Sequence, residues 1–325
     1  MAEVIDAFTH VLPPEFYEEI RKVHHKPREL DTLEDADHMW DLEKRIEDMD
    51  ANGVDKQVIN LYRPPIWLGM DPDDALPLTR LANDLVRDIA DEYPDRFIPV
   101  CTVPFLTGEY VDEFERCVED LGMAGVQIFS NIEGRPLDDP DFHEFYAAVE
   151  DADVPIWIHP QLYDWMPWID ERSDHKMLGW PFDTSVAMNR LVFSGTLDEY
   201  PGLRLIPHHM GGMIPFFGKR ILTFYKTRRE RPDIYPVDWP EFSRPIEEYF
   251  GQFYADTAVS ASPEALRCGY EFFGPDNVVF AVDYPLGPDA GREWLEDTIP
   301  AIEGMEIPEG DKEKIFGGNI QRLLD

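Results

Sequence analysis

Eight short apolar runs, rich in β-branched and aromatic residues, recur along this chain, and longer amphipathic stretches separate most of them. Apolar runs of this length are typical of strands that are buried on both faces of a parallel sheet. The stretches between them, for example residues 78–93 and 141–153, carry apolar residues at helical spacing, so a strand, helix, strand order repeats. Eight such units in 325 residues predict an α/β fold, the (β/α)8 TIM barrel. The predicted strands are residues 4–10, 56–62, 97–103, 125–129, 155–160, 203–209, 253–258 and 278–285.

The segment after the first strand argues against an open, doubly wound sheet, which is the main alternative to a barrel. Such a sheet usually carries a glycine-rich phosphate loop at this point. Residues 9–16, THVLPPEF, contain no glycine. The sequence therefore favours the closed barrel.

Two segments, about 13–50 and 161–185, are longer than a minimal barrel requires. Each follows the C-terminal end of a predicted strand, the face on which barrel enzymes build their active sites. We expect these two segments, called the roof segments below, to cover the pocket. Because the sequence shows no internal repeat, low-complexity tract or Gly/Ser linker, we expect residues 1–325 to form a single domain.

Acidic residues outnumber basic ones by 66 to 29, which gives a formal net charge of -37. The acids are spread along the chain and are not gathered in a tail, so a nucleic-acid partner is excluded. A uniform acidic coat repels itself unless mobile ions screen it. We interpret the charge as adaptation to high salt.

The cysteine pattern and the hydropathy indicate where the protein works. Cys101, Cys117 and Cys268 form no CxxC pair, and two of them lie in apolar stretches typical of buried thiols in a reducing interior. The opening MAEVIDAF enters a predicted strand at once, without a secretory signal. No apolar run approaches the roughly 20 residues that cross a bilayer. We expect a cytoplasmic protein with no membrane partner.

Polar side chains end several of the predicted strands. Because the C-terminal ends of barrel strands meet on one face, these side chains are expected to converge. Imidazoles and a carboxylate in one pocket are ordinary ligands of Zn or another divalent transition metal and leave positions open for water or substrate. The sequence therefore predicts a metal site. The residues concerned are His10, His159, His208, His209, Asp256 and Asp283.

A resemblance to a known family is carried by five stretches that together run nearly from end to end of the chain: IDAFTHVLP, WIHP, NRLVFSGTLDEYPGLRLIPHHMGG, FAVDYPLG and IFGGNIQRLL. The chain resembles the amidohydrolase superfamily, and within it the branch of aminocarboxymuconate-semialdehyde decarboxylase and the aromatic-acid decarboxylases. The first stretch lies where that family has D-x-H-x-H followed by proline, and the third is similar to its R-L-x-x-S-G stretch leading into H-x-G-G. The fourth is similar to its S-D-Y-P and the fifth to its G-N-A-x-R-L-L.

The resemblance assigns roles to four positions. It implies that His10, His159 and Asp283 bind the metal, with Zn as the first choice and Mn as the second. It also implies that Asp283 moves protons and that His209 contacts the metal-bound water or the substrate. His208 has no counterpart in the family pattern; we place it on the substrate side of the pocket, with packing in the barrel wall as the alternative.

Phe8 departs from the family, which has His or Glu at this position. A phenyl ring offers no lone pair to a cation, so we expect Phe8 to lie against the metal without bonding to it. The three remaining ligands are the usual protein share of a catalytic Zn site. Two alternatives stay open: Asp6, which shares a strand face with Phe8, could complete the ligand set, or the pocket could hold no metal.

Further residues are expected to line the substrate site. Arg63 directly follows the second strand, where it could pair with a substrate carboxylate or form a surface salt bridge. Trp180 and Phe182 supply aromatic bulk that favours a planar or apolar substrate. Arg220 is a candidate contact to substrate or to a second subunit, and we expect a homodimer.

The resemblance implies a metal-dependent nonoxidative decarboxylase of a small aromatic or unsaturated carboxylic acid. The same pocket would suit a metal-dependent hydrolase of an amide, ester or lactone, since both use a metal, a carboxylate that moves protons and a histidine. A catalytically degenerate barrel that only binds a ligand is the third interpretation, and it follows if Phe8 abolishes metal binding.

Overall fold

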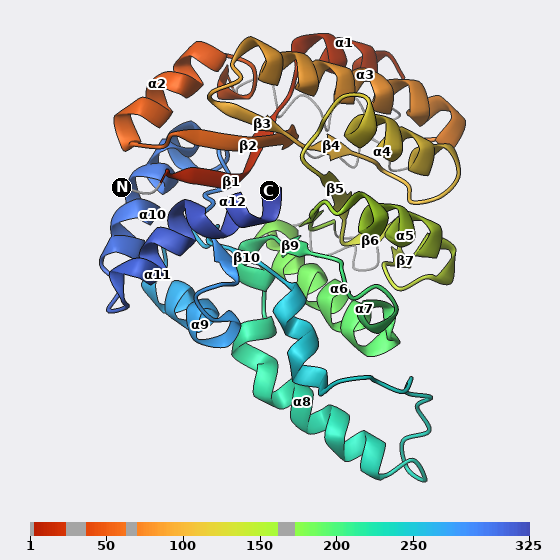
Figure 1. Ribbon diagram of the computed structural model, residues 1–325. Coiled ribbons are helices and arrows are strands. Elements are labelled where there is room, and N and C mark those ends of the chain that lie inside the picture. Colours follow the sequence, from red (N-terminus) through yellow and green to blue (C-terminus); the bar gives the residue numbers. More distant parts are fainter. Residues whose placement is uncertain (1–2, 24–36, 63–69, 162–172) are drawn as a thin grey trace.

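The computed structural model describes residues 3–23, 37–62, 70–161 and 173–325. Its central strands run parallel, and helices pack around them (Figure 1). A short antiparallel hairpin, β6 (Asn131–Ile132) and β7 (Arg135–Pro136), is separate from these strands. The central strands are β1 (Ile5–Val11), β2 (Lys56–Leu61), β3 (Phe97–Pro99), β4 (Cys101–Thr102), β5 (Val126–Phe129), β8 (Ile156–His159), β9 (Leu205–Pro207), β10 (Ala255–Asp256) and β11 (Val278–Val279).

Backbone hydrogen bonds join these strands into a ring. The strands pair as three parallel sheets, β1-β2-β3, β4-β5-β8-β9 and β10-β11. Only Val100 separates β3 from β4, so the described residues contain eight strand paths, one for each predicted run. The predicted (β/α)8 barrel is confirmed. Three bonds close the seams between the sheets: Val100 N to Ile59 O at 3.0 Å, Tyr254 N to Leu205 O at 2.7 Å, and Ala7 N to Phe280 O at 2.8 Å.

Helices follow the strands on the outside of the ring, and one of them projects from it (Figure 1). Local signals set their ends: Asp71 caps the first turn of α3 by accepting a hydrogen bond from Asp73 N, and α2 ends where Gly53 adopts a left-handed φ of 70°. The projecting helix is α8. The α-helices are α1 (Pro14–Val23), α2 (Leu42–Asn52), α3 (Pro72–Glu92), α4 (Glu109–Glu119), α5 (His143–Ala152), α6 (Trp180–Ser194), α7 (Thr196–Glu199), α8 (Ile214–Glu230), α9 (Pro263–Phe273), α10 (Arg292–Glu303), α11 (Glu309–Glu313) and α12 (Asn319–Leu324).

Two apolar clusters make up the core. The larger one lies between the strands and the surrounding helices, and the smaller one draws residues from successive strands of the ring. Trp157 belongs to the smaller cluster, where its indole Nε1 donates a hydrogen bond to Ala7 O at 2.7 Å. The buried residues that this inner cluster takes from the strands or from positions directly beside them are Ile5, Ala7, Phe8, Val58, Val100, Trp157, Ile206, Val279 and Ala281.

The described parts of the two roof segments are largely helical. The first contains α1, α2 and a short 3-10 helix at Asp37–Met39, and the second contains a π-helix at His175–Gly179 and the start of α6. Both follow strand C-terminal ends, as the sequence indicates, and their covering of the pocket stays a prediction. Among the helices that the structure describes, none is long and apolar enough to span a membrane.

A buried arginine ties the first roof segment to β1. The guanidinium of Arg45, on α2, donates to His10 O and to Thr9 Oγ1, each at 2.5 Å, and to Gln57 Oε1 at 2.6 Å. The group is fully buried and lies 5.0 Å from the centre of the Tyr284 ring. Arg45 therefore ties α2 to the backbone of His10.

We expect Arg45→Leu to lower the free energy of unfolding by about 3–5 kcal/mol, because it leaves three buried acceptors without their donor. Urea denaturation measures the change. Arg267→Leu is the matched control: Arg267 pairs with Glu271 on the surface, with 53% of its side chain exposed, and should shift stability by no more than about 0.5 kcal/mol. Equal stabilities for the two variants would contradict the anchoring role.

Candidate active site

Five ionisable side chains gather at the C-terminal ends of the strands. His10 belongs to β1, His159 ends β8, His208 and His209 follow β9, and Asp283 follows β11. All except His209 are almost completely buried. Their chain positions are far apart, and the shared face of the barrel brings them together.

Asp283 lies at the centre of this cluster. Its Oδ1 atom is 3.1 Å from His10 Nε2 and 3.2 Å from His208 Nε2. The ligand atoms of these three residues all lie within 4.8 Å of one another. The His159 ring is adjacent, with its centre 5.3 Å from that of His10 and 5.7 Å from that of His208.

Each of the three buried imidazoles is held through Nδ1. In His10 this atom contacts Asn60 Oδ1 at 2.7 Å, and in His159 it contacts Pro160 O at 2.8 Å. In His208 it contacts the Asp256 carboxylate. Because an oxygen acceptor at Nδ1 places the proton there, it leaves the Nε2 lone pair available, which is how proteins orient histidine ligands.

The donor atoms fit a divalent cation. Nε2 of His10, Nε2 of His208 and Oδ1 of Asp283 are buried and face one another at 3.1 and 3.2 Å, but none forms a well-aligned hydrogen bond with a described residue. Buried polar atoms without partners are costly. Two imidazole nitrogens and a carboxylate oxygen are also the ligand types that Zn and Mn accept. The cluster therefore has the chemistry and spacing of a metal site.

Charge is concentrated in the cluster. Burial disfavours the ionised Asp283, but the charge on His208 and the contact with His10 outweigh it and hold its pKa well below the usual range. Burial also opposes charge on His208, yet the carboxylates of Asp256 and Asp283 raise its pKa to about 10. Burial lowers the pKa of His10 and, more strongly, that of His159. Without metal, Asp283 is thus an anion that faces the imidazolium of His208. A divalent cation bound here would displace the Nε2 proton of His208.

His209 occupies the more open side of the cluster. Its side chain is 19% exposed, its Nε2 is 3.9 Å from Asp283 Oδ2, and its ring stacks on Trp180 with centres 6.4 Å apart. Burial, together with the charge on His208, lowers its pKa to about 4, so it is neutral at pH 7. His209 and Asp283 both have left-handed backbone angles, with φ of 57° and 67°. Such conformations are strained for non-glycine residues and concentrate at functional sites.

Phe8 packs against the imidazoles. Its ring is fully buried, and its centre lies 4.2 Å from the His208 ring, 5.6 Å from the His10 ring and 6.2 Å from the His159 ring. Trp180 covers another side, 5.9 Å from the His159 ring. The pocket thus combines charged donors with aromatic walls.

Other predicted site residues lie elsewhere. Phe182 is 38% exposed and lines a surface groove between α6 and α8. Arg63 lies outside the described residues. Asp6 is fully buried, and its two oxygens accept hydrogen bonds from Val282 N and Gln57 Nε2, so they are not free for a cation.

Two further residues position the cluster: Asn60, which the sequence analysis did not single out, and Asp256, which it named at a strand end without a separate role. Asn60 supports His10, and Asp256 supports His208. Each is a fully buried polar residue in a run of apolar strand residues. A polar residue within such an apolar run is the sequence signal that could have identified both of them.

Comparison with known proteins identifies the family of this chain and several relatives. The family model described as Amidohydrolase matches residues 5–325. A 2-amino-3-carboxymuconate-6-semialdehyde decarboxylase from Dictyostelium discoideum is 31% identical over 91% of this chain and 79% of the relative. A gamma-resorcylate decarboxylase from Rhizobium sp. (strain MTP-10005) is 30% identical over 86% of each chain.

A solved structure with the same fold is similar over almost its whole length. It is a 5-carboxyvanillate decarboxylase from Novosphingobium aromaticivorans, complexed with manganese and 4-hydroxy-3-methoxy-5-nitrobenzoic acid. The TM-score is 0.87 and the identity 25%, with 99% of this chain and 96% of that chain covered.

Proposed function

The chain belongs to the amidohydrolase family, and from that premise we propose that it is a metal-dependent nonoxidative decarboxylase of a small aromatic or unsaturated carboxylic acid. The observation that carries the proposal is the strand-end cluster, in which buried imidazoles and the Asp283 carboxylate direct their donor atoms to one point. The relatives are decarboxylases by name, so the predicted class, a carboxy-lyase of amidohydrolase type, is confirmed.

For the metal we propose His10, His159 and Asp283 as protein ligands. The Nε2 atom of His10 and the Asp283 carboxylate already face each other, and the neutral ring of His159 is adjacent. Zn was the first choice from sequence; the manganese in the related 5-carboxyvanillate decarboxylase gives Mn equal support. When bound, the ion would hold the substrate carboxylate and a neighbouring oxygen and withdraw charge from them.

The residues of the chain would move the proton. Decarboxylation adds one proton to the carbon that carries the carboxylate, and the electrons of the breaking C–C bond return to that carbon framework as carbon dioxide leaves. We propose that either Asp283 or a water molecule assisted by His209 delivers the proton; since the pKa of Asp283 is held low, the carboxylate would carry the proton only transiently. His209, which is neutral, partly exposed and 3.9 Å from Asp283, can bring that proton in from solvent.

The substrate would lie between the metal ligands and the aromatic wall. Trp180 offers a planar surface beside His159 and His209, and a benzoic acid derivative would stack there. We retain Phe8 and His208 as the inner boundary of this space. Arg63 is proposed to pair with a substrate carboxylate, whereas Phe182, which lines the surface groove between α6 and α8, lies outside the proposed substrate site.

A panel of acids and esters tests this function. The protein is stripped of metal, reloaded with Mn or Zn, and offered hydroxybenzoic acids and dienoic acids, with carbon dioxide release as the readout. We expect release only from the reloaded protein. Hydrolysis of an ester, lactone or amide instead would establish the hydrolase alternative, and failure to bind a stoichiometric ion would favour the degenerate binding barrel.

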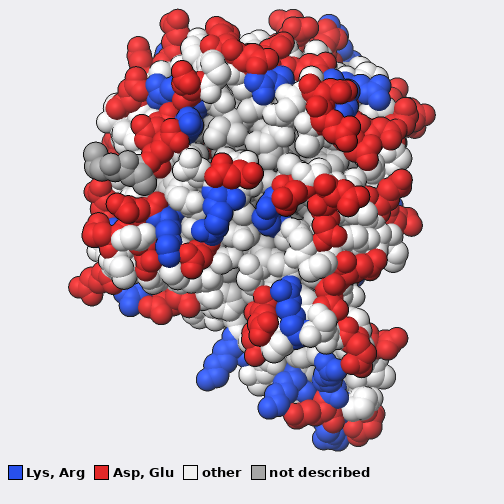
Figure 2. Space-filling view, viewed as in Figure 1, with Lys and Arg blue, Asp and Glu red and all other residues white. Residues whose placement is uncertain are grey.

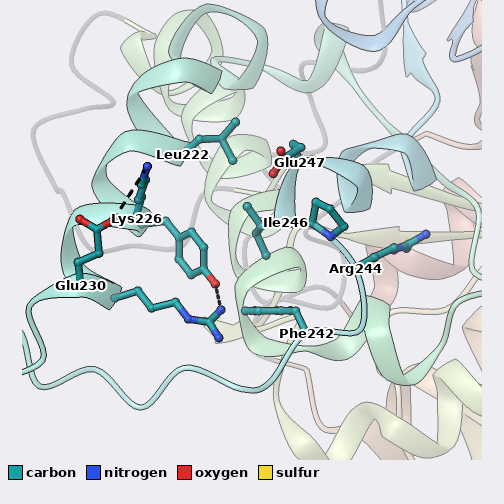
Figure 3. Close-up of a pocket in the computed structure, with 10 residues that line it drawn as sticks. Leu222, Lys226, Glu230, Phe242, Arg244, Ile246 and Glu247 are labelled. Atoms are coloured by element: carbon teal, nitrogen blue, oxygen red, sulfur yellow. Dashed lines mark hydrogen bonds and ion pairs between the residues drawn. The ribbon is translucent and has the colours of Figure 1, made fainter.

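We propose that α8 and its surroundings bind a second copy to form a homodimer. Figure 2 shows acidic residues spread widely over the visible face, and basic residues next to acidic ones on the arm that α8 forms. Phe216 is 77% exposed there, and Phe217 and Phe224 are also exposed. Near the C-terminal end of α8, a pocket of about 570 Å³ is lined by residues such as Tyr225 and Phe242 (Figure 3). Aromatic and basic side chains are typical of interfaces.

Light scattering tests the dimer. Wild type should have twice the mass of the chain, and Phe216→Glu should reduce it to a monomer at the same concentration. The matched control is Arg267→Glu, a surface change on α9. A monomeric wild type would exclude this interface.

We also propose a cytoplasmic location, which agrees with three free cysteines.

We propose that the acidic surface is an adaptation to high salt, and we expect stability to rise with ionic strength. The net charge is -37, and the screening length shrinks from about 30 Å at 0.01 M to about 3 Å at 1 M. Weaker repulsion favours the compact state. Melting curves in a KCl series measure this, and a sucrose series separates screening from solute exclusion. A melting temperature that stays flat up to molar KCl would remove the proposal.

A further inference from the structure

We propose that His208 is an additional metal ligand, that it takes over the coordination position which Phe8 cannot fill, and that Asp256 positions it. This inference rests on the metal-dependent function proposed above. It concerns a histidine that the family pattern does not account for.

The geometry places His208 in the ligand cluster. Its ring is fully buried, and its Nε2 lies 3.2 Å from Asp283 Oδ1, the same oxygen that His10 Nε2 approaches at 3.1 Å. All three donor atoms lie within 4.8 Å of one another. A histidine that only packed in the barrel wall would not need its Nε2 beside the same carboxylate oxygen that His10 approaches, and this nitrogen forms no well-aligned hydrogen bond with a described residue.

Asp256 fixes the direction of that nitrogen. Its Oδ2 atom accepts the Nδ1 proton of His208, and its Oδ1 atom accepts hydrogen bonds from Ala258 N at 3.1 Å and Met210 N at 3.3 Å. The carboxylate is fully buried and is itself held by backbone donors. A carboxylate behind a histidine, with the second nitrogen facing a cation, is the usual support of a metal-binding imidazole.

Phe8 explains why this extra ligand is needed. Its ring lies 4.2 Å from the His208 ring at an angle of 37°, so the two side chains occupy neighbouring space beside the cluster. Phe8, on β1, contributes no lone pair to a cation, whereas His208, just after β9, contributes the lone pair of its Nε2 atom. A cation would therefore be held by four protein groups: His10, His159, His208 and Asp283.

Metal affinity, measured as the Kd for Mn by competition with a chelator, tests the proposal without reference to activity. We expect His208→Ala to weaken Mn binding roughly 100-fold or more and Asp256→Asn to weaken it about 10- to 100-fold. Pulsed electron paramagnetic resonance of the Mn-loaded protein should count one coordinated imidazole fewer in His208→Ala. His143→Ala is the matched control, since His143 also pairs with a carboxylate, at 3.2 Å, but lies on α5 and is one-third exposed.

A rescue variant separates a ligand role from a structural one. Phe8→His in the His208→Ala background restores a donor from β1, and we expect it to recover most of the lost affinity and the lost imidazole signal. Asp256→Asn keeps the shape of the side chain, so its effect does not depend on the folding of His208→Ala. Unchanged Mn affinity and imidazole count in both single variants would overturn the inference while leaving the proposed function intact. A wild type that binds neither Mn nor Zn would overturn both.

Discussion

Replacing Asp283 with asparagine is expected to abolish turnover while the barrel remains folded. The side chain lies after β11, contacts His10 and His208 through Oδ1, and has Oδ2 3.9 Å from His209 Nε2. An amide cannot deliver a proton, and it is a weaker ligand for a cation than a carboxylate. Loss of general acid–base catalysis alone lowers rates by about 10²- to 10⁴-fold, and the weaker metal site adds to that loss.

Activity and stability should separate in this variant. Carbon dioxide release measures the first and urea denaturation the second. Asp276→Asn is a suitable control, because Asp276 pairs with Lys314 on the surface with 59% of its side chain exposed. If Asp283→Asn loses several kcal/mol of stability, as a core truncation does, the residue is structural and the catalytic role is wrong.

Replacing His209 with alanine should cut turnover by about 10²- to 10⁴-fold and leave the metal bound. His209 is the more exposed member of the cluster, and its Nε2 is 3.9 Å from Asp283 Oδ2, farther than the Nε2 atoms of His10 and His208 are from Oδ1. Its pKa of about 4 means that the neutral ring is present throughout pH 6–8, so its own titration should not limit turnover in that range.

The measurement pairs kinetics with metal analysis of the same preparation. A fall in kcat with stoichiometric metal would support a proton-carrying role for His209. Loss of the metal together with activity would instead make His209 a ligand and would contradict its assignment. His143→Ala is the matched control, since it also removes an imidazole but His143 pairs with Glu199 on the surface, away from the cluster, and should retain activity.

The architecture could be predicted from the sequence because buried parallel strands leave a dense apolar signal. Each of the eight predicted runs contains a strand of the ring. The lengths were less predictable: 253–258 and 278–285 contain the two-residue strands β10 and β11, and 97–103 is interrupted at Val100. Apolar composition marks burial, whereas the hydrogen bonds that define a strand depend on its neighbours.

The cluster was predictable in location but not in orientation. The rule that barrel strands end on one face brings His10 and Asp283 together whatever the details. The sequence PHHMGG does not say which histidine turns inward. That depends on the backbone, which is extended at His208 with φ of -71° and left-handed at His209. The pairing of His208 with Asp256 joins residues 48 positions apart, so only the folded chain reveals it.

The central claim, metal-dependent decarboxylation, is tested most directly by following the reaction in D₂O with nuclear magnetic resonance. Metal-loaded protein and a hydroxybenzoic acid should give carbon dioxide and one product that carries deuterium only at the carbon that lost the carboxylate. The same protein treated with a chelator should give neither until Mn or Zn is restored. The claim would be contradicted if metal-loaded protein released no carbon dioxide from any acid of the panel, or if release were equally fast after the metal had been removed.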